Sequence, residues 1–201
     1  EIYVMNADGS DRIRLTDNDA YDREPEWSPD GAQIVFTSDQ SGDSAIYVMN
    51  TDGSEQTRVS DQVGGVEQDA FIWGTPGSGD GQFHQPLNVA VASDGSVYVA
   101  DAYNHRIQKF TSDGVFVSKW GTPGSGDGQF SQPVNVAVGS DDSVYVVEKA
   151  NHRIQKFTSD GVFVSKWGTE GAGDGEFNQN DGPYGVAVVS DGSVYIADTD
   201  N

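Results

Sequence analysis

The chain of 201 residues contains no cysteine and no long apolar segment. Without cysteine, neither a disulfide nor a thiolate metal site can form, although this absence does not decide the compartment. No apolar run approaches the roughly 18–20 residues that span a bilayer. No signal peptide is visible either. We therefore expect no membrane insertion.

Basic residues are scarce. The chain has 11 Lys and Arg residues against 32 Asp and Glu residues, which gives a formal net charge of −21 at pH 7. Binding to nucleic acid is driven by Lys and Arg side chains that displace counterions from phosphates. The charge therefore argues against nucleic acid as a partner, and equally against an anionic membrane surface.

Two internal repeats are present. Residues 73–119 and 120–166 match at 39 of 47 positions, and a third copy starts at Trp167. A second kind of repeat, 44 residues long, begins at Glu1 and again at Ala45, and both copies continue as Ile-Tyr-Val-Met-Asn. Periods of about 40–50 residues in a strand-rich sequence predict an array of small sheets, most often a β-propeller.

One repeat divides into four strands. Residues 88–92, 96–101, 105–110 and 115–120 are rich in β-branched and aromatic residues or alternate between polar and apolar ones. Asp-Gly pairs mark the tight turns, because Gly tolerates positive φ and Asp binds nearby backbone N–H groups. The result is a four-stranded antiparallel meander, with the two most apolar strands innermost and buried on both faces.

The predicted fold is an all-β propeller of about four such blades. We expect full blades at 25–60, 88–120 and 135–167. The outer strands near 1–16 are expected to pair with the inner strands near 185–201 and so close the ring as a shared blade. Residues 61–74 are interpreted as a splice between the two repeat types, with a possible rudimentary fifth blade.

The segment 71–201 resembles NHL repeats. The resemblance rests on Gly-Ser-Gly-Asp-Gly-Gln-Phe at 77–83 and 124–130 and on Asn-His-Arg-Ile-Gln-Lys-Phe at 104–110 and 151–157. The segment 1–62 looks like the WD-like repeat of TolB-type propellers, through Ile-Tyr-Val-Met-Asn and through Trp-Ser-Pro-Asp-Gly. Both resemblances imply propellers that are mostly non-enzymatic and bind proteins on a loop face. Related enzymes include lyases and lactonases that use a metal in the central channel.

Several motifs are interpreted as structural. Phe83, Phe130 and Phe177 recur at the end of the Gly-rich connector, and we expect them to pack between blades. His105 and His152 occupy the same repeat position, which favours a structural role over catalysis. No Ser/His/Asp arrangement and no His-rich metal spacing is present. The connector itself has no following Lys and carries an Asp, so we do not interpret it as a phosphate loop.

Loop carboxylates are the candidate binding groups. The predicted topology gathers acidic residues on the face of the blade connectors and of the loops between second and third strands, and function tends to be carried on such loops. The candidate site residues are Asp39, Asp43, Asp101, Tyr103, Glu148 and Asp198. Clustered carboxylates suit Ca²⁺, but none of these loops has the spacing of a known calcium loop. Solvated surface acid is the preferred interpretation, and no cofactor is assigned.

The leading hypothesis is a non-enzymatic interaction or structural scaffold, extracytoplasmic or secreted, that binds a protein or other ligand through this acidic loop face. One alternative is a metal-assisted lyase or lactonase with inward-pointing His or carboxylate groups. Another is a repeat unit of an extracellular filament or surface assembly that self-associates. Near-identical blades argue against a single dedicated active site.

Overall fold

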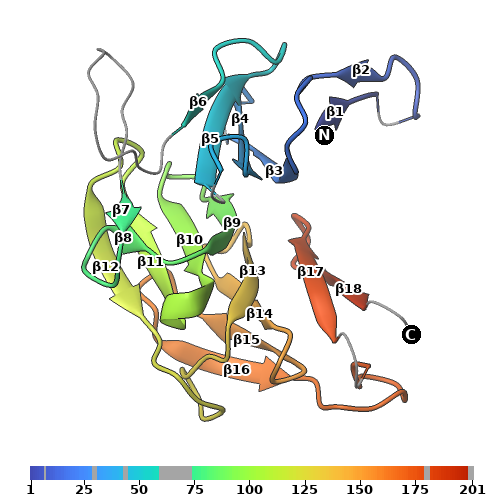
Figure 1. The fold of residues 1–201 in the computed structure, drawn as a ribbon. Helices are drawn as coiled ribbons and strands as arrows, with labels where there is room; N and C mark the ends of the chain where they lie inside the picture. Colours follow the sequence, from blue (N-terminus) through green and yellow to red (C-terminus); the bar gives the residue numbers. More distant parts are fainter. Residues whose placement is uncertain (7, 29–30, 43–44, 59–73, 179–181, 199–201) are drawn as a thin grey trace.

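The computed structural model describes residues 1–6, 8–28, 31–42, 45–58, 74–178 and 182–198. Within this part, every regular element is a β-strand except one short 3₁₀ helix, η1 (Ala102–Asn104). The described residues include no helix with the length and apolar character that crossing a membrane requires. The predicted all-β class is confirmed, and Figure 1 shows the sheets arranged along an arc.

Three sheets are four-stranded antiparallel blades. Blade A consists of β3 (Arg23–Trp27), β4 (Gln33–Ser38), β5 (Ala45–Asn50) and β6 (Thr57–Arg58). Blade B consists of β9 (Pro86–Val91), β10 (Val97–Asp101), β11 (Arg106–Phe110) and β12 (Phe116–Trp120). Blade C consists of β13 (Pro133–Val138), β14 (Val144–Glu148), β15 (Arg153–Phe157) and β16 (Phe163–Trp167).

Three smaller sheets have two strands each. The N-terminal half-blade is formed by β1 (Tyr3–Val4) and β2 (Ile13–Arg14), and the C-terminal half-blade by β17 (Pro183–Val188) and β18 (Val194–Asp198). The connector before blade B contains the parallel pair β7 (Thr75–Pro76) and β8 (Gln82–Phe83). The predicted splice at 61–74 lies, except for residue 74, outside the described residues.

The tight turns form as the Asp-Gly pairs predict. The Asp94 carboxylate accepts a hydrogen bond from the backbone N–H of Ser96 at 2.8 Å, and Gly95 between them has a φ of +83°. Asp191 and Ser193 repeat the bond at 2.8 Å in the C-terminal half-blade. These bonds satisfy a turn N–H group locally, so each turn can reverse the chain without help from the rest of the fold.

The core lies between neighbouring sheets. In β10, Val97 and Val99 pack toward blade A, whereas Tyr98 and Ala100 pack toward blade C. This alternation follows from the two-residue period of a strand, and it means that every inner strand needs a sheet on each side. Phe83, Phe130 and Phe177 are buried in the same layers between sheets, which confirms the packing role predicted for them.

The closing blade differs from the prediction. The N-terminal half-blade packs on blade A through Ile2 and Leu15, and the C-terminal half-blade packs on blade C through Val186. Within the described residues the two half-blades form separate sheets, so the predicted pairing near 1–16 with 185–201 is not confirmed. Figure 1 shows them at the two ends of the arc.

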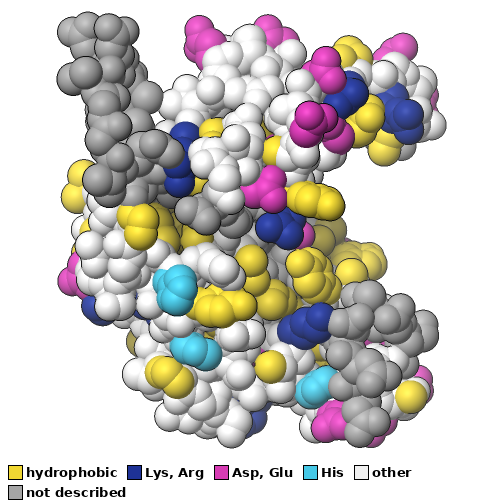
Figure 2. Space-filling model, viewed as in Figure 1, with side chains coloured by type: hydrophobic (Ala, Val, Ile, Leu, Met, Phe, Trp, Pro, Cys, Tyr) yellow, Lys and Arg dark blue, Asp and Glu magenta, His cyan; other side chains and the backbone are white. Residues whose placement is uncertain are grey.

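Burial on both faces, expected for every inner strand, holds only where sheets lie on both sides. All residues of β10 and β14 are buried, whereas β3 and β18 are largely exposed or half-buried. The exposed side of β18 faces away from blade C, where no described sheet covers it. Figure 2 shows the molecule hollowed between the two ends of the arc, with hydrophobic side chains visible in the hollow.

Candidate functional site

Asp101, a predicted binding residue, belongs to an internal ion pair. Nε of Arg106 donates to Oδ2 of Asp101 at 2.7 Å, and both side chains are almost fully buried. The two terminal nitrogens of Arg106 donate to three carbonyl oxygens of the Gly-rich connector, those of Ser78, Gly79 and Gln82, at 2.7–2.8 Å. The guanidinium therefore ties the connector to the second and third strands of blade B.

Blade C repeats this arrangement with a longer acid. Nε of Arg153 donates to Oε1 of Glu148 at 2.6 Å. The terminal nitrogens of Arg153 donate to the carbonyl oxygens of Ser125, Gly126 and Gln129 at 2.6–3.0 Å. The recurring Asn-His-Arg-Ile-Gln motif thus fixes the connector to the blade through its Arg. The Arg pairs with an acid in both blades, which explains why each copy of the motif has an acid five residues before the Arg.

The placement of Asp101 and Glu148 on a binding face therefore needs correction. Their side chains are 0% exposed. Besides the Arg, each carboxylate accepts a backbone N–H from the connector, that of His84 at 2.7 Å or of Ser131 at 3.0 Å. Loop position alone predicted exposure, but the connector folds over the end of the strand and covers the acid. Neither residue can touch a partner directly.

Tyr103 lies at the surface as expected. Its side chain is exposed, and its ring centroid lies 5.2 Å from that of His84. Asp39 is half-buried, and its carboxylate accepts the backbone N–H of Tyr21 at 2.8 Å. Both residues therefore have local partners within the chain.

Asp198 is half-buried and accepts the backbone N–H of Asn178 at 3.4 Å. Asp198 is thus the third copy of the carboxylate that receives a connector N–H in blades B and C. Asp43 lies outside the described residues.

His105 and His152 share one backbone conformation at the same repeat position. His105 sits in the left-handed region with a φ of 53°, and its Nδ1 accepts the backbone N–H of Gln132 at 3.2 Å. This bond links blade B to the connector that precedes blade C. His152 takes the same backbone conformation, with a φ of 49°.

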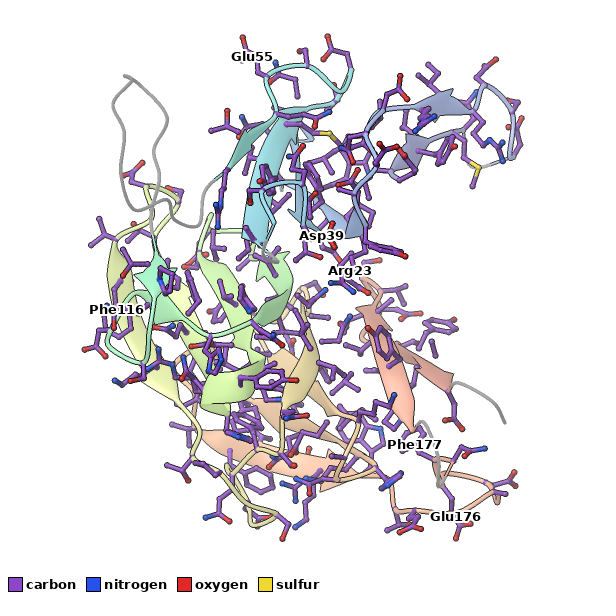
Figure 3. All side chains as sticks on the ribbon, in the orientation of Figure 1. Arg23, Asp39, Glu55, Phe116, Glu176 and Phe177 are labelled. Carbon is purple, nitrogen blue, oxygen red and sulfur yellow. The ribbon has the colours of Figure 1, made fainter. Side chains whose placement is uncertain are left out.

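A pocket at the axis of the arc brings together acidic groups that the sequence did not single out. It has a volume of about 410 Å³ and lies between β3 and the C-terminal half-blade. It is lined by Glu24, Glu26, Asn135, Gly185, Val186, Ala187, Tyr195, Ile196 and Ala197. Figure 3 shows Arg23, next to these acids, at the end of β3 that points toward β17. We call this space the axial pocket.

Glu24 is held at the axis by two other blades. Its Oε2 accepts hydrogen bonds from Nδ2 of Asn88 at 3.4 Å and from Nδ2 of Asn135 at 3.2 Å. Asn88 and Asn135 occupy equivalent positions in the inner strands of blades B and C. Glu24 has a φ of 53° and lies where the pairing of β3 with β4 shifts register, a bulge that re-aims its side chain. Three blades thus converge on one carboxylate.

Gly185 occupies the third equivalent position, in β17. Blades B and C carry Asn88 and Asn135 at this position, whereas the C-terminal half-blade carries a glycine, which has no side chain. This substitution leaves space beside Glu24 and Glu26, and Gly185 accordingly lines the axial pocket.

The pKa values of both acids are raised. Burial raises the pKa of Glu24, while the hydrogen bonds from Asn88 and Asn135 and the charge of Arg23 lower it in part. Partial desolvation of the carboxylate in the axial pocket raises the pKa of Glu26, although the residue as a whole is exposed, and the negative charge of Glu24 raises it further. Two carboxylates that repel each other at one site bind a cation more readily than either would alone. Within the described residues neither forms an ion pair.

The described residues contain no group of three or more His, Cys, Asp or Glu side chains placed to hold a metal ion. A calcium site made from the predicted loop carboxylates is therefore not assembled in this part of the chain. In the sequence, the signal for the axial acids was Arg-Glu-Pro-Glu-Trp at 23–27. Two acids stand there in a strand that was expected to be apolar and innermost.

The repeat types identified in the sequence match known family models. Residues 1–74 match the PD40 model, described as a TolB beta propeller domain. Residues 83–110 and 130–157 match the NHL repeat. The chain therefore combines a TolB-like propeller region with NHL repeats, as the sequence motifs predicted.

Curated relatives share short stretches. Protein lin-41 of Caenorhabditis elegans is 47% identical over 47 residues, which are 23% of this chain and 4% of that protein. The Tol-Pal system protein TolB of Bordetella pertussis is 44% identical over 43 residues, which are 21% of this chain and 10% of that protein. The chain thus spans only a small part of these relatives.

Solved propellers share the fold at low identity. TolB from Acinetobacter baumannii matches with a TM-score of 0.62 and 11% identity, over 99% of this chain and 43% of the other. A streptogramin B lyase structure matches with a TM-score of 0.60 and 19% identity, over 98% of this chain and 54% of the other. Each covers nearly all of this chain while using about half of its own length.

Proposed function

We propose that this chain, which joins a TolB-like propeller region to NHL repeats, is a non-enzymatic binding module that takes up a basic side chain of a protein partner in its axial pocket. The observation that carries the proposal is the pair Glu24 and Glu26, two carboxylates at one pocket without an ion pair to any described residue. A Lys or Arg side chain would supply the missing positive charge.

The shape of the pocket suits a long basic side chain. A Lys stem is apolar and its ammonium group is strongly hydrated, so it fits a site with apolar walls and acids at one end. Val186 and Ile196 line the wall, and Tyr195 offers an exposed ring on which a cation can lie. The net charge of −21 would draw a basic partner toward the molecule from a distance.

The enzymatic alternative has less support. A metal-assisted lyase or lactonase would need a third ligand side chain beside Glu24 and Glu26, and the described residues offer no such group of three. The resemblance to a lyase structure at 19% identity concerns the fold.

The binding proposal is tested by calorimetric titration with an acetylated, amidated Gly-Lys-Gly tripeptide. The expected result is binding that weakens about tenfold or more in E24Q and in E26Q, because each variant removes one charged acceptor. The matched control is E55Q, which removes the same charge at the far tip of blade A (Figure 3) and should bind as the parent does. Equal affinity for a peptide with norleucine in place of Lys would contradict the proposal.

We also propose an extracytoplasmic location, since part of the chain resembles a Tol-Pal system protein. Fractionation of the native host with an antibody against the chain tests it. Recovery in the cytoplasmic fraction alone would overturn this part of the proposal.

A further inference from the structure

One position at the axis differs among the inner strands of blade B, blade C and the C-terminal half-blade. β9, β13 and β17 have the sequences Pro-Leu-Asn-Val-Ala-Val, Pro-Val-Asn-Val-Ala-Val and Pro-Tyr-Gly-Val-Ala-Val. The third residue of each strand is Asn88, Asn135 or Gly185. Gly185 thus lacks the side-chain amide that the other two sheets place at this position.

The two asparagines use this amide to link blades. Asn88 and Asn135 are 2% and 5% exposed, so both amides are held inside the fold. Each donates from Nδ2 to Oε2 of Glu24, at 3.4 Å and 3.2 Å. Oδ1 of Asn88 also accepts the backbone N–H of Val136 in blade C at 2.9 Å. An Asn at this position therefore aims its amide N–H groups at the axial carboxylate.

The backbone conformation of Gly185 does not require a glycine. Its φ lies outside the left-handed region, unlike that of the connector residue Gly121. The pairing of β17 with β18 shifts register beside Gly185, but the same irregularity lies beside Asn88 and beside Asn135 in their own blades. The two asparagines show that a residue with a side chain adopts this local structure.

The packing around Gly185 does not require a glycine either. Among the described residues, a Cβ built on Gly185 would meet the Cβ of Ala197 at 3.4 Å, which is an ordinary van der Waals distance, and no other atom within 4 Å. Ala197 lies opposite Gly185 in the sheet, just as Ala100 lies opposite Asn88 in blade B. Blade B thus accommodates an Asn across from an alanine.

The axial pocket accounts for the missing side chain. A glycine in the middle of a strand weakens the strand, because it adds conformational freedom to the unfolded chain and offers nothing to pack. Such a glycine often marks a place where a ligand or another backbone comes close. Gly185 lines the axial pocket together with Glu24 and Glu26. The vacant position therefore lies on the same pocket as the two acids.

We propose that Gly185 is the specificity-determining residue of the axial pocket. This inference rests on the proposed function, in which Glu24 and Glu26 receive the ammonium group of a basic side chain. An Asn at position 185 would bring a third amide to these carboxylates and satisfy them from within the fold. With a glycine there, the carboxylates keep their capacity to accept hydrogen bonds from a ligand.

Competition between an amide and an ammonium group explains the effect. The amide of an Asn supplies two N–H donors without charge, and the ammonium group of a Lys supplies three donors with a full positive charge. Both would donate to the same carboxylate oxygens. The amide belongs to the chain and loses no translational freedom when it binds, whereas a separate ligand does. An internal Asn should therefore displace a weakly bound cation.

The experiment is calorimetric titration of G185N and G185A with the acetylated, amidated Gly-Lys-Gly tripeptide. G185N should bind it about tenfold or more weakly than the parent, because the amide takes the place of a hydrogen bond to a charged group. G185A adds a Cβ and no amide, and should bind as the parent does. The matched control is G175N in the connector, where nothing lies within 4 Å of the added Cβ, and it should also bind as the parent does.

Thermal unfolding shows whether G185N keeps the fold. G185N should melt at or above the temperature of the parent, because the new amide can link β17 to Glu24 as Asn88 and Asn135 link their own strands. Loss of binding together with unchanged or higher stability is the expected signature. A lower melting temperature for G185N would overturn the proposal, since the fold itself would then require the glycine.

The binding results distinguish the role of Gly185 from the proposed function. Equal affinity of the parent and G185N would overturn the role of Gly185 and leave the pocket as a cation site. Equal losses in G185A and G185N would also overturn it, because a Cβ rather than an amide would then exclude the ligand. A parent that does not bind the tripeptide would overturn the proposed function, and the role of Gly185 with it.

Discussion

The Arg side chains of the repeated Asn-His-Arg-Ile-Gln motif show how one residue can organise a module. Arg106 satisfies one buried carboxylate and three connector carbonyls, so its planar fork serves several loop groups at once. A Lys could supply the charge but could not reach all of these acceptors. The motif is thus explained by connector geometry rather than by chemistry on a substrate.

Loss of Arg106 should destabilise blade B strongly. R106L leaves Asp101 buried without its ion pair, and removing one partner of a buried pair typically costs about 3–5 kcal/mol. The free energy of unfolding from urea titration measures the effect. D101E is the matched control, because blade C already uses Glu148 in the same role, and it should lose far less. Equal losses in both variants would contradict the assigned role.

Glu26 should make stability and binding depend on pH in opposite directions. Its pKa is raised in the folded state above the ordinary value of 4.5, so the folded protein holds the proton longer than the unfolded chain. The free energy of unfolding should therefore fall as the pH rises from the ordinary pKa of a Glu through the raised pKa of Glu26. E26Q should be more stable than the parent at neutral pH, and the difference should vanish at acid pH. A difference that is constant from pH 3 to pH 8 would contradict this.

Cation binding in the axial pocket should strengthen over the same pH range. The proposed ligand pairs with ionised carboxylates, so affinity for the Gly-Lys-Gly peptide should rise as Glu24 and Glu26 lose their protons. Calorimetric titration at several pH values checks this, with E26Q expected to show a shallower dependence. Affinity that does not vary with pH would remove the two acids from the site.

At the scale of the element, the connectors depend on close packing as much as on hydrogen bonds. Gly121 has a φ of +107°, and a Cβ built there would lie 2.4 Å from the Phe130 ring and 2.8 Å from the carbonyl oxygen of His105. Gly168 repeats this arrangement against Phe177 and His152. The connector Gly residues therefore allow the Phe to fill the layer between blades.

G121A should consequently cost more than an Ala at a glycine in open space. Overpacking of this kind typically adds about 1–3 kcal/mol to the strain of a positive φ, which is about 1 kcal/mol or more. The matched control is G192A, where φ is +86° and nothing lies within 4 Å of the added Cβ. Thermal unfolding compares the two variants. Similar melting temperatures would show that the connector shifts to accommodate the added Cβ without a loss of stability.

The strands of blades B and C could be predicted closely from the repeat, and the exposure of their loops could not. Alternation and Asp-Gly turns are local signals, so residues such as Ser96 and Gly95 can be placed from the sequence alone. Asp101 and Glu148 stand at loops in the sequence, but a connector some 20 residues away covers them. Burial of that kind depends on contacts between distant segments, and no local pattern reports it.

At the scale of the whole molecule, the axial pocket exists because three blades are placed around one axis. Oε2 of Glu24 in blade A accepts hydrogen bonds from Asn88 of blade B and Asn135 of blade C. The C-terminal half-blade adds Gly185 and Ala197 to the lining of the pocket.

The sequence by itself determined the repeat, the antiparallel meander, the turn chemistry and the acidic surface, because each depends on residues close together in the chain. Only the tertiary structure decided which acids are buried in ion pairs inside the fold and which converge at the axis. It also decided that the two half-blades lie apart at the ends of an arc. These outcomes depend on how sheets stack, since Glu24 meets Asn88 and Asn135 only when three blades are placed around one axis.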